Sequence, residues 1–436
     1  MENRAMAAED RPVIPALSLR AQAALACYRL GFGVAGMAAA AAVPWLSLYS
    51  RRVKEGYADY FGQVRRCTGR DVFWIHAVSM GEAMVAYGFA AELKREFADC
   101  EIVFTSTHPD VIAGMRRRGL AAQTAYFPLD TPVGMQRIFE RWHPRAVFVS
   151  ETDFWPEFST QCRQRRIPLY LINGRISSKI AAFYAHCPGL AEVVFSAYSL
   201  LAVQTDSDAS RLLAIGVAPE HIAVLGNMKA DLTIAPGSVD LSAFIAWIAG
   251  RRAVVMGSLH PGEFNMLLPV IKSQAAAGRA VIVAPRNPAF AAEWQQILFK
   301  HDVKSSLRSQ GLASAQVLLL DSMGELAAVY SLAGAALVGG SLDGDVGGHN
   351  PLEVIQQSVP LLMGLNCRNF ADLVAELAAA EAMISCRDGE DVENSVNRLL
   401  ADSDFASAMI ARAAAVLAAN RGALARTMRL IAARLR

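Results

Sequence analysis

Short, almost uninterrupted apolar runs recur along this sequence, and they are the feature that most constrains its fold. Segments with helical patterns, such as Ala83–Phe97 and Trp155–Arg166, separate these runs. Strands that are apolar on both faces and alternate with helices are typical of a parallel sheet with helices on each side. The predicted strands of this α/β protein are Val72–His76, Ile102–Ser106, Ala146–Ser150, Leu169–Ile172, Leu201–Gln204, Ile222–Leu225, Ala253–Gly257, Ala280–Ala284, Val317–Leu320, Ala335–Val338 and Pro360–Met363.

The strands fall into two series, which indicates two wound domains. The stretch Leu232–Asp240 between them contains Pro and Gly and is typical of a linker. A chain of 436 residues is also too long for one ordinary core. We therefore assign residues 51–238 and 239–436 to two Rossmann-like domains, and we expect a ligand in a cleft between them, at the carboxyl ends of the strands.

Residues 1–50 differ in character from both domains. The run Leu30–Ser50 contains no charged residue and is about long enough to cross a hydrocarbon core of roughly 30 Å. No Asp or Glu occurs between Arg11 and Lys54, whereas several arginines do, which favours the anionic cytoplasmic face of a membrane. We expect residues 1–50 to form a membrane-anchoring segment, either spanning or in plane. A buried Ala-rich helix is the alternative.

Charge and cysteine usage exclude several classes of protein. The net charge of +2 is too small to indicate a nucleic-acid-binding protein. The seven cysteines show neither CxxC nor Cys/His spacing, so the sequence predicts no zinc site and no disulfide framework. A reducing compartment follows from the same observation.

The first predicted strand ends in the motif His76-Ala-Val-Ser-Met-Gly-Glu82. Its glycine allows a tight turn, which places Glu82 at the start of the next helix. A carboxylate at that position can act as a general base for a hydroxyl group. It can equally be the acidic member of a capping box, and the sequence leaves both readings open.

The second domain carries a glycine-rich loop, Gly339–Glu353, between a strand and a helix. Backbone N–H groups at such a helix start favour phosphate binding, and Glu353 could accept hydrogen bonds from a ribose diol. A tight loop followed by a capped helix is the structural alternative. Arg286 could form a paired contact with phosphate. Three further polar segments follow predicted strands and should emerge at the same sheet edge: Gly257–Glu263, Pro285–Pro288 and Asp321–Leu326.

Taken together, these motifs resemble those of the 3-deoxy-D-manno-octulosonic acid (Kdo) transferases of lipopolysaccharide synthesis. The resemblance extends from Arg51 to Phe370. The motifs that carry it are, in order, His76-Ala-x-Ser-x-Gly-Glu82, Pro128-Leu-Asp130, Ser150-Glu-Thr-Asp-Phe-Trp-Pro156, Asn173-Gly-Arg-Ile-Ser177, Gly226-Asn-Met-Lys229, Gly257-Ser-x-His260, Pro285-Arg286, Met323-Gly-Glu-Leu326, Gly347-Gly-His-Asn-Pro-Leu-Glu353 and Asn369-Phe370.

The resemblance implies a GT-B fold with an N-terminal membrane-anchor helix, located at the cytoplasmic face of the inner membrane. It implies an inverting glycosyltransferase that moves Kdo from CMP-Kdo to a lipid A precursor, lipid IVA, without metal or cofactor. The first domain would bind the acceptor and the second the CMP-sugar. Glu82 would be the catalytic base, with Glu151 as a second important carboxylate. The implied donor-binding residues are Lys229, Ser258, Arg286, Met323, Gly324, Asn350 and Glu353.

The chain departs from the family pattern at a few positions. Asn287 replaces the usual His after Pro-Arg, and Asp153 and Glu157 replace the usual Glu and Asn around the Trp-Pro pair. One apparent extra residue in the glycine-rich loop brings Asp343 and Asp345. Two added carboxylates beside an anionic donor are unfavourable unless they point away or contact basic groups.

Two other functions are compatible with these residues. One is a transferase of the same fold that uses another nucleotide sugar. The other is a non-catalytic, membrane-bound lipopolysaccharide-binding relative, against which the presence of both Glu82 and Arg286 argues.

Overall fold

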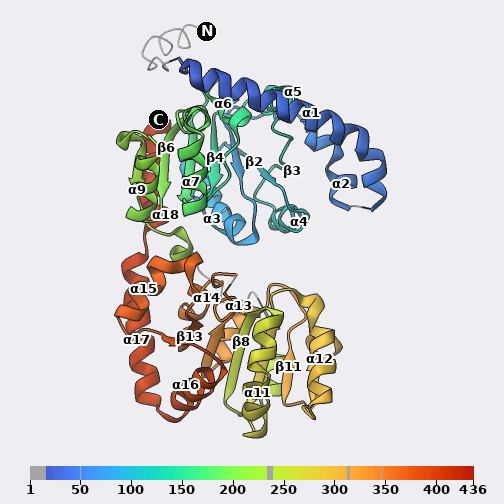
Figure 1. Cartoon of the computed structure of the whole chain (residues 1–436), viewed down its shortest axis with the longest axis vertical. Coiled ribbons are helices and arrows are strands. Elements are labelled where there is room, and N and C mark those ends of the chain that lie inside the picture. The colour runs from blue at the N-terminus through green and yellow to red at the C-terminus, as the bar shows by residue number, and fades with distance from the viewer. Residues whose placement is uncertain (1–15, 50, 233–238, 312–314, 345) are drawn as a thin grey trace. The chain divides into compact units, whose positions relative to one another are not determined.

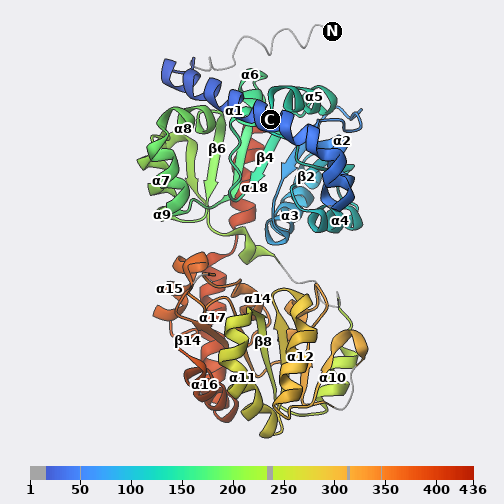
Figure 2. The same ribbon diagram turned by 45° about the vertical axis from the view of Figure 1, so that its right-hand side comes forward.

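The computed structural model describes residues 16–49, 51–232, 239–311, 315–344 and 346–436. The chain forms two compact units (Figures 1 and 2). The first unit extends to Leu232 and also includes Gly422–Arg436, and the second ends at Arg421. Each unit is an α/β structure built on its own parallel sheet.

The first unit contains a parallel sheet with the strand order β3-β2-β1-β4-β5-β6-β7 within the described residues. In the centre, Trp74 is paired with Val103 on one side and with Val147 on the other. The strands are β1 (Val72–His76), β2 (Glu101–Ser106), β3 (Gln123–Tyr126), β4 (Ala146–Ser150), β5 (Leu169–Gly174), β6 (Tyr198–Val203) and β7 (Ile222–Val224).

Helices cover both faces of this sheet, because alternate side chains of each buried strand point to opposite faces. Along β1, Val72 and Trp74 pack beneath α5, α6, α8 and α9, whereas Phe73 and Ile75 pack beneath α3, α4 and α18. The helices of the unit are α1 (Leu19–Tyr49), α2 (Arg51–Tyr60), α3 (Met80–Glu96), α4 (Pro109–Arg118), α5 (Pro132–Trp142), α6 (Pro156–Gln164), α7 (Ser178–His186), α8 (Pro188–Phe195), α9 (Asp206–Ala214), η2 (Pro219–His221), η3 (Met228–Asp231) and α18 (Ala423–Leu435).

The second unit is organised in the same way, with the strand order β10-β11-β9-β8-β12-β13-β14. Its strands are β8 (Ala253–Leu259), β9 (Ala280–Pro285), β10 (Ser305–Leu307), β11 (Val317–Leu319), β12 (Ala335–Val338), β13 (Leu361–Gly364) and β14 (Ile384–Cys386). Its helices are α10 (Ser242–Ile248), α11 (Pro261–Ala276), η4 (Pro288–Phe290), α12 (Ala291–Lys300), η5 (Arg308–Gln310), α13 (Leu326–Val329), η6 (Tyr330–Leu332), α14 (Leu352–Ile355), η7 (Arg368–Phe370), α15 (Ala371–Ala379), α16 (Gly389–Ala401) and α17 (Ser403–Asn420).

Every strand predicted from the sequence overlaps an observed strand, and the three strands that were missed all lie at sheet edges. β3 ends the first sheet, and β10 and β14 end the second on opposite sides. An edge strand pairs on one side only, so its sequence is under less pressure to be apolar on both faces. The sequences Gln-Thr-Ala-Tyr, Ser-Ser-Leu and Ile-Ser-Cys accordingly lack the long apolar runs of the central strands.

The N-terminal helix differs from the expected one in where it begins. The prediction placed an uncharged segment at Leu30–Ser50, but α1 begins at Leu19 and contains Arg20 and Arg29. Among the described residues, none of the helices is both long enough and apolar enough to traverse a bilayer. Residues 1–15 and residue 50 of the expected anchor lie outside the described part of the chain.

The first half of α1 is a component of the first unit. Ala21 and Leu25 are buried against Val193 of α8. The two helices approach closely, since a Cβ on Gly189 would lie 2.8 Å from the carbonyl oxygen of Arg20. This part of the expected anchoring segment therefore packs within the first unit.

The C-terminal helix α18 packs in the first unit, although the sequence assigned residues 239–436 to the second domain. Asp231 caps its start, because its carboxylate accepts hydrogen bonds from the N–H groups of Gly422 and Leu424. Ile431 and Leu435 then pack against the face of the sheet that α3 and α4 also cover. Its amphipathic pattern did not reveal which sheet it would cover.

Candidate active site

Glu82 lies in the first turn of α3, shortly after the carboxyl end of β1, and takes part in two hydrogen bonds at the start of the helix. The Oγ atom of Ser79 accepts a hydrogen bond from the Glu82 N–H at 3.2 Å. In return, the Oε2 atom of Glu82 accepts one from the Val78 N–H at 2.9 Å. These two hydrogen bonds fix the carboxylate at the edge of the sheet. Capping and proton transfer are thus compatible roles for this residue.

Glu151 and Lys229 form an ion pair at the same sheet edge. Glu151 follows β4 and has a positive φ of 60°, which turns the chain sharply after the strand. Its Oε1 atom lies 2.6 Å from the Lys229 ammonium, and both side chains are largely shielded from solvent. Lys229, expected among the donor-binding residues, lies in the first unit, as the predicted domain boundary also had it.

Asn173 holds this pair in place, a role that the sequence analysis did not assign to it. Its Nδ2 atom donates to Glu151 Oε1 at 3.2 Å, and its Oδ1 atom accepts from the Met228 N–H at 2.8 Å. Asn173 is itself buried, with a positive φ of 52°. The only signal in the sequence was its position at the head of the Asn173-Gly-Arg-Ile-Ser177 motif.

The electrostatics of this cluster concern Glu82 most directly. Burial raises the pKa of the Glu82 carboxyl above its ordinary value, and the neighbouring Glu151 carboxylate raises it further. The Val78 N–H group, Ser79 and the Lys229 ammonium oppose this rise in pKa. A carboxyl group with a raised pKa is a stronger base when ionised, as general-base catalysis requires.

His76, at the end of β1, is fully buried beside this cluster. Its Nε2 atom lies 2.6 Å from Asp153 Oδ2, and its Nδ1 atom lies 2.9 Å from Thr105 Oγ1. Asp153, one of the departures from the family pattern, therefore joins the segment after β4 to the last residue of β1. The segment after β4 carries Glu151, and the segment that follows β1 carries Glu82.

In the second unit, the expected donor-binding residues lie at one edge of the sheet. Ser258 is at the end of β8, with a positive φ of 58°, and Arg286 directly follows the neighbouring strand β9. Met323 and Gly324 follow β11, and Met323 is 72% exposed. The carboxyl ends of adjacent parallel strands share an edge, and ligands of such sheets bind there.

Asn350 and Glu353 complete this set at the start of α14, after β12. The Oδ1 atom of Asn350 accepts a hydrogen bond from the Leu352 N–H at 3.1 Å. Glu353 lies near Tyr330, since its charge raises the pKa of that buried phenol beyond what burial alone does.

Glu263 organises the glycine-rich loop, although in the sequence it stands out only as the last residue of a motif. Its side chain is fully buried at the start of α11. Oε1 accepts hydrogen bonds from the N–H groups of Ser341 and Leu342 at 3.0 and 2.9 Å. Oε2 accepts from those of Gly340 and His260 at 2.7 and 3.0 Å. One carboxylate therefore fixes the entry to the loop.

A stacked histidine pair lies beside Arg286. The Nε2 atoms of His260 and His349 are 2.9 Å apart, and their rings are nearly parallel. Burial lowers the pKa of His349 to about 4, and the charges of Arg286 and His260 contribute to the lowering. His349 is thus neutral near pH 7, and Arg286 is the fixed positive charge of this cluster.

Asp343, which departs from the family pattern, lies at the first turn of α11. A Cβ on Gly262 would lie 3.2 Å from its Oδ2 atom. A helix N-terminus stabilises a carboxylate, which offsets the unfavourable charge expected here. Asp345 lies outside the described residues.

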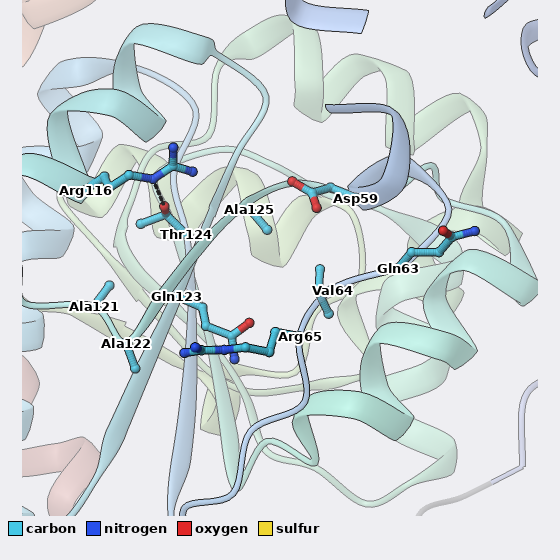
Figure 3. A pocket seen from close by; sticks show the side chains of 10 residues that line it. All are labelled: Asp59, Gln63, Val64, Arg65, Arg116, Ala121, Ala122, Gln123, Thr124 and Ala125. Carbon is cyan, nitrogen blue, oxygen red and sulfur yellow. Dashed lines mark hydrogen bonds between the residues drawn. The ribbon is translucent and has the colours of Figure 1, made fainter. Parts of the chain in front are cut away.

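Within the described ranges, no group of three or more His, Cys, Asp or Glu side chains is placed to hold a metal ion. A separate pocket of about 390 Å³ lies against edge strand β3 in the first unit (Figure 3). Asp59 and Gln63, from α2 and the chain just after it, form one side, and Arg116 and Thr124 form another. No residue of the expected catalytic or donor-binding sets lines this pocket.

Comparison with known proteins places the chain among sugar transferases. The family described as 3-deoxy-D-manno-octulosonic-acid transferase (kdotransferase) matches residues 52–232. The 3-deoxy-D-manno-octulosonic acid transferase of Haemophilus influenzae is 28% identical over 393 residues, which cover 88% of this chain and 91% of that protein. The C-terminal CMP-Kdo binding domain of WaaA from Acinetobacter baumannii is 32% identical, covering 40% of this chain and 94% of that domain, with a TM-score of 0.37. Residues 52–232 thus match the Kdo transferase family, and curated Kdo transferases are similar to most of the chain.

The protein is a glycosyltransferase, and its fold is shared with more distant proteins. The crystal structure of the kitacinnamycin glycosyltransferase matches with a TM-score of 0.54, at 14% identity, over 84% of this chain and 99% of that chain. Two parallel sheets of this kind are similar to those of GT-B glycosyltransferases.

Proposed function

We propose that the protein transfers Kdo from CMP-Kdo to a lipid A precursor, lipid IVA, with inversion and without a metal, in lipopolysaccharide synthesis. The match of residues 52–232 to the Kdo transferase family and the similarity to curated Kdo transferases support the choice of sugar. The observation that carries the mechanism is the placement of Glu82, whose carboxylate is held by the Val78 N–H group beside the Glu151–Lys229 ion pair and has a raised pKa.

The proposed reaction is a single displacement at the ketosidic carbon of Kdo. An acceptor hydroxyl oxygen attacks this carbon as the bond to the CMP phosphate oxygen breaks. Glu82 takes the proton of the hydroxyl group, and CMP leaves with the electron pair of the broken bond. Glu151 orients Lys229, and the Lys229 ammonium would meet the anionic groups of the donor.

The second unit would bind CMP-Kdo through the residues at its sheet edge. Arg286 supplies positive charge for the phosphate, and the backbone N–H groups near Asn350 supply further hydrogen-bond donors. Glu353 would accept hydrogen bonds from the ribose hydroxyls, and Ser258, Met323 and Gly324 would line the site. Positive charge and fixed donors stabilise a departing phosphate, so no metal is required in this proposal.

We further propose that the protein acts at the cytoplasmic face of the inner membrane, where its lipid acceptor would be reached. Helix α1 exposes large apolar side chains, with Leu19, Leu30 and Trp45 each at least 73% accessible. The neighbouring sequence is free of acidic residues from Arg11 to Lys54. Exposed apolar groups beside basic residues favour contact with an anionic lipid surface.

Incubation of the full-length protein with CMP-Kdo and lipid IVA, followed by mass spectrometry of the lipid, tests this function. One or more added Kdo residues are expected. A parallel reaction with other nucleotide sugars tests the alternative donor, because efficient transfer from one of those and none from CMP-Kdo would replace the proposal.

A further inference from the structure

The first unit contains two buried carboxylates, Asp130 and Glu157, which meet at the start of α6. Glu157 is fully buried, and Asp130 is 2% exposed. Asp130 accepts hydrogen bonds from the N–H groups of Glu157 and Phe158 at 2.9 and 2.8 Å, and so caps α6. Both carboxylates also have partners that come from α1, more than a hundred residues earlier in the chain.

Arg29 of α1 binds Glu157 with two nitrogens. Its Nε atom lies 2.7 Å from Oε2, and one terminal nitrogen lies 3.2 Å from Oε1. Gln161 also donates to Oε1, at 2.6 Å. Paired contacts of this kind fix both position and orientation, and a buried carboxylate deprived of its cation is strongly unfavourable.

Tyr28 makes the second connection, since its hydroxyl donates to Asp130 Oδ2 at 2.8 Å. One turn later in α1, Phe32 contacts Trp155 edge to face, with ring centroids 6.2 Å apart. Trp155 is the residue immediately before α6. Three successive contacts from one face of α1 therefore converge on the start of α6.

The segment held by these contacts begins with Glu151. Only Thr152, Asp153 and Phe154 separate Glu151 from Trp155. At its other end the segment is fixed by the Glu151–Lys229 pair, and in the middle by Asp153 and the buried His76. Helix α1 supplies the third support, at Trp155 and Glu157.

We propose that Tyr28 and Arg29 are positioning residues for the Kdo transfer reaction, and that α1 is a brace for the segment Glu151–Glu157. This inference rests on the proposed function, in which Glu151 orients Lys229 beside the catalytic base. It assigns to α1 a part in catalysis that is separate from any attachment to lipid.

The first test compares Arg29→Met with Arg29→Met/Glu157→Gln in the full-length protein, using acceptor and enzyme in detergent. Arg29→Met leaves Glu157 buried without its cation, and we expect kcat to fall at least tenfold. Glu157→Gln removes the orphaned charge and is expected to restore most of kcat. Arg20→Met, on an exposed position of the same helix, removes the same charge and should retain wild-type kcat. Wild-type kcat in Arg29→Met, or no recovery in the double variant, would overturn the proposal.

Hydrogen exchange gives a readout that does not depend on the donor or acceptor. Amides of residues 151–158 should exchange faster in Arg29→Met and recover in the double variant, while those of the second unit stay unchanged. Unchanged exchange over 151–158 would refute the proposal that α1 acts as a brace, even if activity fell. Failure of the wild-type protein to use CMP-Kdo would instead count against the proposed function.

Tyr28→Phe provides a milder variant should Arg29→Met not fold. It removes one hydroxyl and keeps the ring, so we expect a smaller fall in kcat with the same local increase in exchange. Flotation with anionic vesicles should be unchanged in Tyr28→Phe. Loss of flotation together with normal activity in detergent would show that α1 acts only in attachment.

Discussion

The ammonium group of Lys229 lies 2.6 Å from Glu151 Oε1, and the two side chains come from different loops at one edge of the first sheet. Asn173 binds both loops, through Glu151 and through the Met228 N–H. The pair is held beside Glu82, whose pKa responds to both charges. The ionisation of the Glu82 carboxyl therefore depends on this ion pair.

Replacing either member of the pair should shift the pH dependence of kcat/KM, in opposite directions. Glu82 must be ionised to act as a base, so activity is lost as the pH falls through its pKa. Glu151→Gln removes a charge that raises this pKa, and the acidic limb should move to lower pH. Lys229→Met removes a charge that lowers it, and the limb should move to higher pH. Shifts of the same sign in both variants would refute the coupling.

Arg286→Ala should weaken CMP binding about ten- to hundredfold. The loss of one charge-assisted contact to phosphate typically costs about 1.5–3 kcal/mol. Calorimetry with CMP measures this directly. Arg387→Ala is a suitable control, because Arg387 is 73% exposed and pairs with Asp391 at the surface, where such pairs contribute little. Equal CMP affinity in the two variants would give Arg286 another role.

Glu263→Gln should loosen the glycine-rich loop and weaken CMP binding. An amide has one accepting oxygen, so it cannot serve the four N–H groups that the carboxylate binds. We expect about 1.5–3 kcal/mol of lost stability in chemical denaturation. Glu293 occupies the same third position of helix α12 but is exposed, so Glu293→Gln is the matched control. If both variants were equally stable and bound CMP equally well, the loop would not depend on Glu263.

Deleting residues 1–50 should destabilise the first unit as well as change membrane binding. The deletion removes Tyr28 and Arg29, which are the α1 partners of Asp130 and Glu157, and it exposes Val193. Loss of a partner from a buried charge typically costs about 3–5 kcal/mol. A lower thermal midpoint and reduced activity in detergent are expected. A truncated protein with full stability and full activity in detergent would restore the view of this segment as a simple tether.

The central strands of both sheets could be predicted because each is buried on two faces, and this constraint is visible in a single run of residues. Edge strands such as Gln123–Tyr126 have no such signature. The pairing of distant helices was also hidden, since nothing near Arg29 indicates that its partner is Glu157. The departure of Glu157 from the family pattern was visible in the sequence, but only the tertiary fold determines that its partner is Arg29.

The candidate site, like the fold, could be predicted from the sequence only in part. Glu82 could be found because its motif lies within one turn after a strand. Lys229 could be singled out as a donor-binding residue, but its pairing with Glu151 could not be foreseen. The role of Glu263 was missed because its four partners include N–H groups some eighty residues later in the chain. Short motifs thus indicated candidate reactive groups, but not the residues that hold those groups in place.

The most direct test of the account is the rate of Kdo transfer by Glu82→Gln under conditions where CMP binding is measured in parallel. The amide oxygen of Gln can still accept the hydrogen bond from the Val78 N–H group, so the variant should fold. Removing a general base typically costs about 10²–10⁴ in rate. We predict a loss of that size with unchanged CMP affinity, and near wild-type transfer by Glu92→Gln on the same helix. Transfer by Glu82→Gln within a few-fold of wild type would contradict the assignment of Glu82 as the base.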